Sequence, residues 1–202
     1  MNTPVTFSDR MRALTGAWVA RAGRFVHRLG VHPDTITWVG LLVVAAGAVL
    51  IARGEFFWAG LLLLISLPLD ALDGAVARAM ARTDRRGAVL DSTLDRYADG
   101  LIFGAFAYHF ASLGQLEMML VAIAAQIGTF VVSYVRARAG EADLSVKIGL
   151  FSRLERVIVL LIILFVPALI VPGMWVLAIG TNITGLQRLW YVYQHLDREV
   201  GT

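Results

Sequence analysis

The sequence contains no cysteine. This absence excludes disulfide bonds and thiolate metal ligands, so any metal ion would be bound through oxygen or imidazole groups. Charged residues are also few, at 16% of the 202 residues, whereas 58% are hydrophobic. Soluble domains are about 45–50% apolar. With a mean hydropathy of +0.71, the composition predicts a protein whose solvent is lipid.

The first 30 residues lack the long apolar run and the small-residue cleavage site of a signal peptide. Their apolar residues instead recur at spacings of three, four or seven, which predicts one helical stripe. The stripe consists of Phe7, Met11, Leu14, Trp18, Phe25 and Leu29, and five arginines fall mostly elsewhere around the helix. We therefore expect residues 1–30 to form an amphipathic juxtamembrane helix on an anionic membrane surface.

Six apolar stretches follow, joined by short connections. The predicted transmembrane helices cover residues 36–52, 56–77, 91–113, 116–138, 156–171 and 174–193. The apolar part of the second stretch ends at Leu69, short of the roughly 20 residues that cross a bilayer, so we expect its helix to continue through Asp70, Asp73 and Ala77. No repeat or soluble insertion appears. The prediction is an all-α integral membrane protein, with residues 31–202 as one six-helix domain.

The basic residues indicate how the chain is oriented. They gather in the N-terminal arm, in the 78–86 and 136–156 connections and after Arg188, whereas the other three loops hold only Arg53. By the positive-inside rule, an even number of spans with both termini in the cytoplasm is favoured. The net charge of +3 then indicates a membrane surface rather than nucleic acid as partner.

Four carboxylates stand out in this apolar chain. Asp70 and Asp73 are three residues apart at the end of one predicted helix, and Asp91 and Asp95 are four apart at the start of the next, so each pair shares a helix face. The short connection lets the pairs converge. Such a cluster would repel itself unless neutralised, and it suits hard divalent cations such as Mg²⁺, with two ions plausible and Mn²⁺ as an alternative.

The residues after Asp73 add phosphate chemistry. Gly74, Ala75 and Ala77 are small enough for a ligand to approach the backbone, and the Arg78 guanidinium can bind a phosphate in a bidentate manner. Paired metal ions can clamp the oxygens of a displacement at phosphorus, so the stretch predicts a phosphate-transfer site. Singly, each charged residue would be read as an ordinary solvated helix end. A divalent-metal transporter could use the same acids, although no inverted repeat supports it.

As one pattern the stretch reads D-x-x-D-G-x-x-A-R, eight residues, G, three residues, D, three residues, D. The matching positions are Asp70, Asp73, Gly74, Ala77, Arg78, Gly87, Asp91 and Asp95. This pattern resembles the signature of the CDP-alcohol phosphotransferase family. The resemblance implies a membrane enzyme with six transmembrane helices, typically a homodimer, that displaces CMP from a CDP-linked donor with an alcohol.

The resemblance also implies residue roles. Asp70, Asp73 and Asp91 would hold two metal ions, and Asp95 would ligate one of them and act as general base. The donor site would comprise Gly74, Ala75 and Arg78, with Asp34, Thr35, Ile36 and Thr37 of the family-like segment HPDTITWVG. Asp84 stands near the donor, where relatives commonly have threonine, and the adjacent Thr83 is an alternative.

The segments AVLDSTLDRYADG, SYVRARAG and LFSRLERVIVLL look most like bacterial phosphatidylinositol phosphate synthases. The resemblance implies CDP-diacylglycerol as donor, inositol phosphate as acceptor and a cell-membrane enzyme whose active site faces the cytoplasm. The acceptor-phosphate residues would be Ser133, Arg136, Arg138, Arg153, Arg156 and Arg188. The positive-inside rule explains Arg136, Arg138 and Arg153 equally well, whereas Arg188 lies inside an apolar segment, where charge is usually functional.

Two alternatives keep the chemistry: glycerol 3-phosphate as acceptor, or an archaeal ether lipid as donor, as in an archaetidylinositol phosphate synthase. Other polar residues need no catalytic role. Thr181, Asn182 and Thr184 in the last span are expected to form interhelical hydrogen bonds. His109 has no second imidazole at ligand spacing and is expected to pack among its apolar neighbours.

Overall fold

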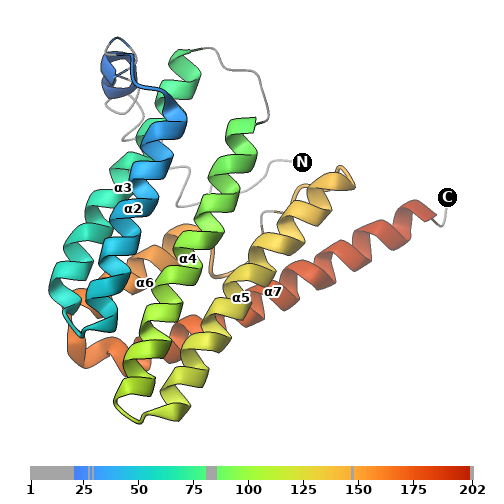
Figure 1. The fold of residues 1–202 in the computed structure, drawn as a ribbon. Coiled ribbons are helices and arrows are strands. Elements are labelled where there is room, and N and C mark those ends of the chain that lie inside the picture. The colour runs from blue at the N-terminus through green and yellow to red at the C-terminus, as the bar shows by residue number, and fades with distance from the viewer. Residues whose placement is uncertain (1–20, 27, 29, 81–85, 147, 201–202) are drawn as a thin grey trace. The chain divides into compact units, whose positions relative to one another are not determined.

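The computed structural model describes the backbone of residues 21–26, 28, 30–80, 86–146 and 148–200, and the side chains of these residues except 70, 71, 73, 78, 79 and 197–200. Within this part of the chain the regular elements are helices, and no strand occurs (Figure 1). They are α2 (Pro33–Ala52), α3 (Phe56–Ala79), α4 (Arg86–Ser112), α5 (Leu116–Glu141), α6 (Arg153–Phe165), the 3₁₀ turn η1 (Pro167–Leu169) and α7 (Ile170–Val200). The predicted all-α class is confirmed.

Among the described residues, four segments are long and apolar enough to cross a membrane: Pro33–Ala52, Phe56–Ala77, Leu116–Glu141 and Pro167–Leu196. The helices α4 and α6 also lie where spans were expected, but they do not meet this measure of length and composition. The first half of α4 carries several charged residues, and α6 has only 13 residues, fewer than the roughly 20 that cross the hydrocarbon core. The structure therefore fits an integral membrane protein with four candidate spans.

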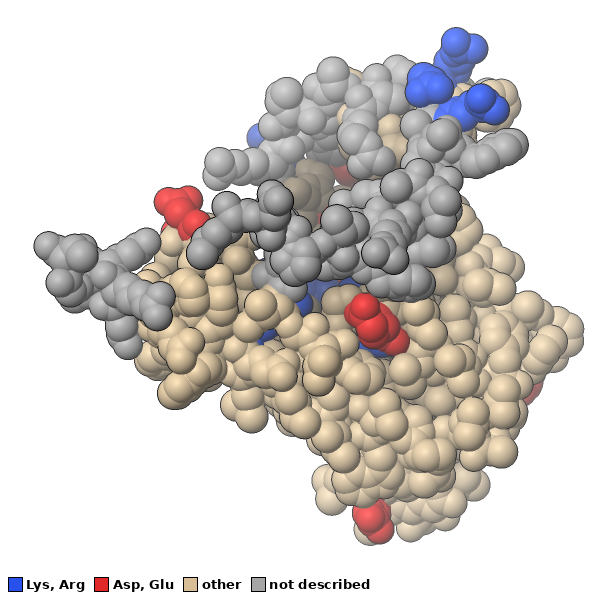
Figure 2. All heavy atoms as spheres, turned by 180° about the vertical axis from the view of Figure 1, so that it is seen from behind, with Lys and Arg blue, Asp and Glu red and all other residues tan. Residues whose placement is uncertain are grey.

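The exterior of the described helices is rich in apolar side chains. Leu42, Trp58, Leu186 and Trp190 each expose 59–67% of their surface, and the described surface in Figure 2 is mostly uncharged. Water would oppose this exposure, whereas hydrocarbon would not. The exposed apolar surface agrees with the membrane class that composition predicts.

The turn between α2 and α3 follows directly from Gly54. Its φ of +80° is a conformation that glycine adopts without steric cost. The Glu55 N–H then donates to Leu50 O at 2.9 Å and the Gly54 N–H to Ile51 O at 2.9 Å, which satisfies the carbonyl groups at the helix end as in a Schellman motif. This turn occupies the short connection expected between the predicted helices 36–52 and 56–77.

Helix α3 continues through Asp70 and Asp73 to Ala79, as predicted, with Pro68 inside it. Helix α4 begins at Arg86, five residues before the expected start at Asp91, so both acidic pairs lie within helices. At the N-terminal side, residues 21–26 and 28 are helical. Gly30, the last residue of the predicted amphipathic helix, is instead in a turn with a φ of +74°. The remaining residues of that predicted helix lie outside the described residues.

The predicted break between the last two helices, at Pro172–Gly173, was wrong. Helix α6 ends at Phe165, and α7 begins at Ile170 and runs through Pro172. Pro167 disfavours helical backbone at Val166, which adopts φ −125° and ψ 83°. Pro172 is tolerated because the first four N–H groups of a helix have no internal acceptor.

Contacts divide the chain into two compact units, residues 1–46 with 61–98 and residues 47–60 with 99–202. In the second unit α5 and α7 lie side by side (Figure 1). Asn182 Nδ2 donates to Ala124 O at 2.9 Å, and the Thr181 hydroxyl lies 3.5 Å from Ala125 O, so the interhelical bonds expected of these two residues are confirmed. The expectation was wrong for Thr184, whose hydroxyl accepts from the Phe151 N–H in the connection between α5 and α6. Their helices meet at Gly128, where a Cβ atom would lie 2.2 Å from Thr181 Oγ1.

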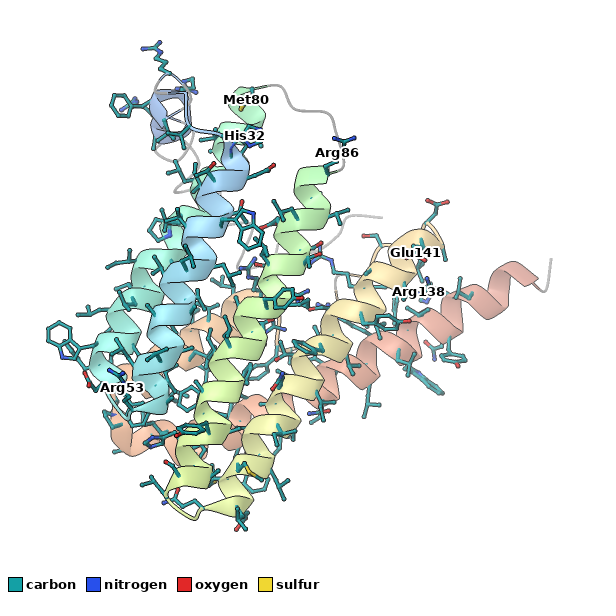
Figure 3. All side chains as sticks on the ribbon, in the orientation of Figure 1. His32, Arg53, Met80, Arg86, Arg138 and Glu141 are labelled. Carbon is teal, nitrogen blue, oxygen red and sulfur yellow. The ribbon has the colours of Figure 1, made fainter. Side chains whose placement is uncertain are left out.

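His109 lies at the end of the second unit where α2 meets α3. Figure 3 places Arg53 at the end away from Arg138 and Glu141. Near Arg53, the imidazole of His109 packs edge-on against Phe56, with ring centroids 4.9 Å apart. The expectation that His109 is a packing residue is confirmed.

Candidate active site

The acidic signature lies on two helices of the first unit. Asp70, Asp73, Gly74, Ala75 and Arg78 lie along the last part of α3, and Asp91 and Asp95 lie in the first part of α4. The spacings of three and four residues place each acidic pair on one helix face, as predicted. The side chains of Asp70, Asp73 and Arg78, and all of Thr83 and Asp84, lie outside the described residues.

The Asp95 carboxylate is largely withdrawn from water. Its side chain is only 15% exposed, and the Arg96 guanidinium lies 3.7 Å from its Oδ2 atom. A carboxylate so withdrawn from water needs cationic or hydrogen-bonding compensation. Among the side chains described, no group of three or more acids, histidines or cysteines could hold a metal ion, so the four-aspartate metal set stays a prediction. Its all-oxygen composition fits a hard divalent cation.

The expected nucleotide segment forms the first turn of α2. Asp34 Oδ2 lies 3.5 Å from His32 Nδ1, and the Thr37 hydroxyl donates to Pro33 O at 3.1 Å. Thr35 is exposed, whereas Ile36 is buried in the core. Ile36 thus serves packing, while its N–H belongs to the first turn of the helix, where N–H groups lack acceptors within the helix. Figure 3 shows His32 and Met80 at the same end of the helix pair α2 and α3.

A contact with α3 at the signature was not anticipated from the sequence. Gly23, in the helical residues 21–26, packs so closely on Ala75 that a Cβ atom at position 23 would lie 2.6 Å from Ala75 Cβ and 2.8 Å from its carbonyl carbon. Ala75 is 4% exposed. The helical residues 21–26 therefore lie directly against Ala75, the residue that follows Gly74.

The second unit brings cationic groups from three helices into range of one another. Arg188 on α7 lies within electrostatic range of both Arg136 on α5 and Arg156 on α6. Arg156 is 3% exposed and Arg188 is 5% exposed. Helix termini explain exposed arginines, but they do not explain two buried ones close to a third. This cationic cluster, Arg136, Arg156 and Arg188, is suited to a multiply charged anion.

One acidic partner of the cluster was missed by sequence reasoning. Asp99 Oδ2 lies 3.6 Å from Arg156 Nη2, and the two side chains are 17% and 4% exposed. Asp99 follows Asp91 and Asp95 at the same spacing of four residues along α4. That continued spacing was the signal that could have identified it.

The remaining acceptor candidates differ in surroundings. Ser133 is half-buried and its hydroxyl donates to Thr129 O at 3.1 Å. Arg138 is exposed and pairs with Glu141, near the end of α5 in Figure 3, and Arg153 is exposed at the start of α6. Arg188 donates from Nη1 to Val132 O and from Nε to Ile148 O, both at 2.9 Å. Two of its five N–H donors thus bind backbone, and three are left for other partners.

Comparison with known proteins identifies the class. A sequence model of the CDP-alcohol phosphatidyltransferase family matches residues 30–186, which include the complete acidic signature. The chain therefore belongs to the CDP-alcohol phosphatidyltransferase family, a family of transferases, and the predicted resemblance is confirmed.

Two relatives within the family have named activities. The chain is 41% identical to the phosphatidylinositol phosphate synthase of Streptomyces avermitilis, over 82% of this chain and 73% of the relative. It is 35% identical to the archaetidylinositol phosphate synthase of Pyrococcus horikoshii, over 88% and 92%.

Crystal structures of the Mycobacterium tuberculosis phosphatidylinositol phosphate synthase are also similar. The one with CDP-DAG bound has a TM-score of 0.81 and 32% identity, covering 87% of this chain and 93% of that one. The one in complex with manganese and citrate has a TM-score of 0.78 and 31% identity, covering 87% and 88%. A divalent metal is thus bound in a close structural neighbour.

Proposed function

We propose that this protein is a phosphatidylinositol phosphate synthase, which transfers the phosphatidyl group of CDP-diacylglycerol to inositol phosphate and releases CMP. The observation that carries the choice of acceptor is the cationic cluster, in which Arg156 and Arg188 are buried and Arg136 lies in electrostatic range of Arg188 from a third helix. Such a cluster suits a phosphate-bearing alcohol better than a zwitterionic one. The names of the Streptomyces and Mycobacterium relatives support the same acceptor.

The reaction follows from the residues of the signature. Asp95 takes the proton of the acceptor hydroxyl, whose oxygen attacks the lipid-side phosphorus of the donor. The new O–P bond forms as the pyrophosphate P–O bond breaks, and CMP leaves. Arg78, Gly74 and Ala75 bind the CDP part together with Asp84 and the turn formed by Asp34, Thr35, Ile36 and Thr37.

Asp70, Asp73, Asp91 and Asp95 would hold two Mg²⁺ ions, with Mn²⁺ as an alternative supported by the manganese-bound neighbour. When bound, such ions polarise the pyrophosphate and stabilise the leaving phosphate. The acceptor phosphate would be held by Ser133, Arg136, Arg138, Arg153, Arg156 and Arg188.

In the cell we expect α4 and α6 to join the four candidate spans, which makes six transmembrane helices in one domain, residues 31–202, behind the juxtamembrane helix. The alternation of basic loops supports cytoplasmic termini, a cytoplasmic active site and insertion in the cell membrane. Family resemblance supports a homodimer.

A panel of acceptors tests the function. Purified protein in detergent or vesicles is incubated with CDP-diacylglycerol, Mg²⁺ and inositol phosphate, inositol, glycerol 3-phosphate or serine, and the lipid products are identified by mass. We expect CMP release and a phosphatidylinositol phosphate product with inositol phosphate. Product with glycerol 3-phosphate alone would overturn the acceptor, and release of CMP with none of the alcohols would overturn the transferase.

The Pyrococcus relative, an archaetidylinositol phosphate synthase, raises the question of whether the donor lipid is ester-linked or ether-linked. Ester-linked and ether-linked CDP-lipids of matched chain length are therefore compared with the same acceptor. A preference for the ester donor is expected, and a strong preference for the ether donor would favour an archaetidylinositol phosphate synthase.

A further inference from the structure

The connection between α5 and α6 runs along one face of α7. Its contacts fall at residues 180, 184 and 188, a spacing of four that places them on one side of the helix. The Phe151 ring lies over Gly180, where a Cβ atom would be 2.6 Å from two ring carbons. The Phe151 N–H donates to Thr184 Oγ1 at 3.0 Å, and Arg188 Nε donates to Ile148 O at 2.9 Å. We call residues 148–151 the docked segment.

Within the docked segment, Gly149 makes a close approach possible. Its φ is +120°, a conformation that L side chains rarely adopt. A Cβ atom at this position would also lie 2.3 Å from Thr184 Cγ2. Thr184 is fully buried, so its methyl group packs against the segment while its hydroxyl accepts the Phe151 N–H.

Arg188 extends this attachment to α5. Its Nη1 donates to Val132 O at 2.9 Å, next to Ser133. A buried guanidinium is costly unless its donors are satisfied, and here backbone carbonyls of α5 and of the docked segment satisfy two of them. The segment is therefore held by polar bonds as well as by apolar packing.

The docked segment leads directly into the arginines of α6. Ser152 is the N-cap of α6, and its hydroxyl donates to the carboxylate of Glu155 in the first turn of that helix. Arg153 begins the helix, and Arg156 lies within its first turn. A displacement of the segment would thus move the start of α6 and the arginines that it carries.

We propose that Thr184 is a positioning residue for the acceptor: its hydroxyl holds the Phe151 backbone, and through it the start of α6, where Arg153 and Arg156 meet the acceptor phosphate. This inference rests on the proposed function, because it takes the cationic cluster as the acceptor site. Loss of the Thr184 hydroxyl weakens acceptor binding, whereas the donor site on α2, α3 and α4 is unaffected.

Thr184→Val tests the inference, because it keeps the shape of the side chain and removes the acceptor of the Phe151 N–H. We expect the KM for inositol phosphate to rise about three- to tenfold, the range that the loss of one hydrogen bond supports. The KM for CDP-diacylglycerol and kcat should stay within about twofold. Thr184→Ser, which restores the hydroxyl, should recover most of the acceptor affinity.

Thr181→Val is the matched control. Thr181 is also fully buried on α7, but its hydroxyl donates to Leu177 O at 2.8 Å and points to α5 rather than to the docked segment. A rise in acceptor KM equal to that of Thr184→Val would show a general packing effect and overturn the proposal. So would an unchanged acceptor KM in Thr184→Val, or equal rises for donor and acceptor.

Amide hydrogen exchange separates this inference from the proposed function. The Phe151 amide should exchange faster in Thr184→Val than in the wild type and in Thr181→Val, whatever the substrate. Unchanged exchange would overturn the docking itself. If the wild type releases no CMP with inositol phosphate, the proposed function fails, and the exchange result still reports on the segment.

Discussion

Arg156 and Asp99 form an ion pair that is largely withdrawn from water, with 3.6 Å between Nη2 and Oδ2. The two residues come from α6 and α4 and are far apart in the sequence. Breaking such a pair leaves an uncompensated charge behind, which is far more disruptive than the loss of a surface pair. The pair therefore orients Arg156, one of the two buried arginines of the cationic cluster.

Asp99→Asn should raise the KM for the acceptor about tenfold, because Arg156 loses the charge that orients it. The KM for the donor should change little. Glu141→Gln is the control: Glu141 pairs with Arg138, and both side chains are at least 60% exposed, so a change within about twofold is expected. A lower acceptor KM in Asp99→Asn would mean that Asp99 competes with the acceptor for Arg156.

Asp95→Asn should abolish turnover, because an amide cannot take the proton of the attacking hydroxyl. The variant should still fold and bind the CDP donor, as measured by its melting temperature and by donor titration. Arg96 lies beside Asp95, so Arg96→Gln is an informative companion and should reduce but not abolish turnover. Near-normal turnover in Asp95→Asn would exclude this carboxylate as the essential base.

Removal of divalent cations should stop CMP release, since four carboxylates in one site need a compensating charge. Treatment with EDTA followed by gel filtration gives the metal-free protein. Activity should return with Mg²⁺ or Mn²⁺. Full activity after exhaustive chelation would contradict the metal set assigned to Asp70, Asp73, Asp91 and Asp95.

Gly23→Val should push the helical residues 21–26 off Ala75, because a Cβ atom at position 23 would lie 2.6 Å from Ala75 Cβ. We expect weaker donor binding and little change in the acceptor KM, measured with vesicles that contain anionic lipid. Gly104→Val is the control, since nothing lies within 4 Å of a Cβ at that position. Equal donor affinity in both variants would contradict the prediction that the contact between residues 21–26 and Ala75 supports donor binding.

Gly128→Ala should destabilise the second unit by about 1–3 kcal/mol, the usual cost of overpacking. The added Cβ would lie 2.2 Å from Thr181 Oγ1 and 2.8 Å from the Asn182 backbone nitrogen, which cannot move freely. Gly140→Ala, with open space around it, should be neutral or slightly stabilising, because alanine is the better helix former. Thermal melting in detergent compares the two, and a lower melting temperature for Gly140→Ala would contradict this reading.

Hydrophobic patterning and the signature spacing predicted the helical class and the position of each long helix. They also predicted that α3 continues beyond its apolar run, because 14 residues are too few to span. The boundary between α6 and α7 was predicted wrongly, since Pro167 and Pro172 are equal candidates by residue type and only their positions in the helices distinguish them. Local sequence carries little information on that point.

The candidate site also has parts that the local sequence predicts and parts that it does not. The acidic pairs lie on their helix faces because a spacing of three or four residues is a local property of a helix. The partners of Arg156 and Arg188 come from other helices and from a connection, so their contacts depend on packing that no local pattern encodes. Asp99 is the exception. Its spacing of four residues from Asp95 is visible in the sequence, but its pairing with Arg156 is not.

Thr184 and Arg188 both bind main-chain atoms of the docked segment, at Phe151 N and Ile148 O. Every amino acid presents that carbonyl, and every one but proline presents that amide. Relatives can therefore exchange the side chains at positions 148 and 150 freely during evolution while keeping the same attachment. The identity of the residue matters instead at Thr184 and Arg188 on α7 and at Gly149 in the docked segment. A search for relatives with this acceptor site should give these three positions more weight than the side chains at positions 148 and 150.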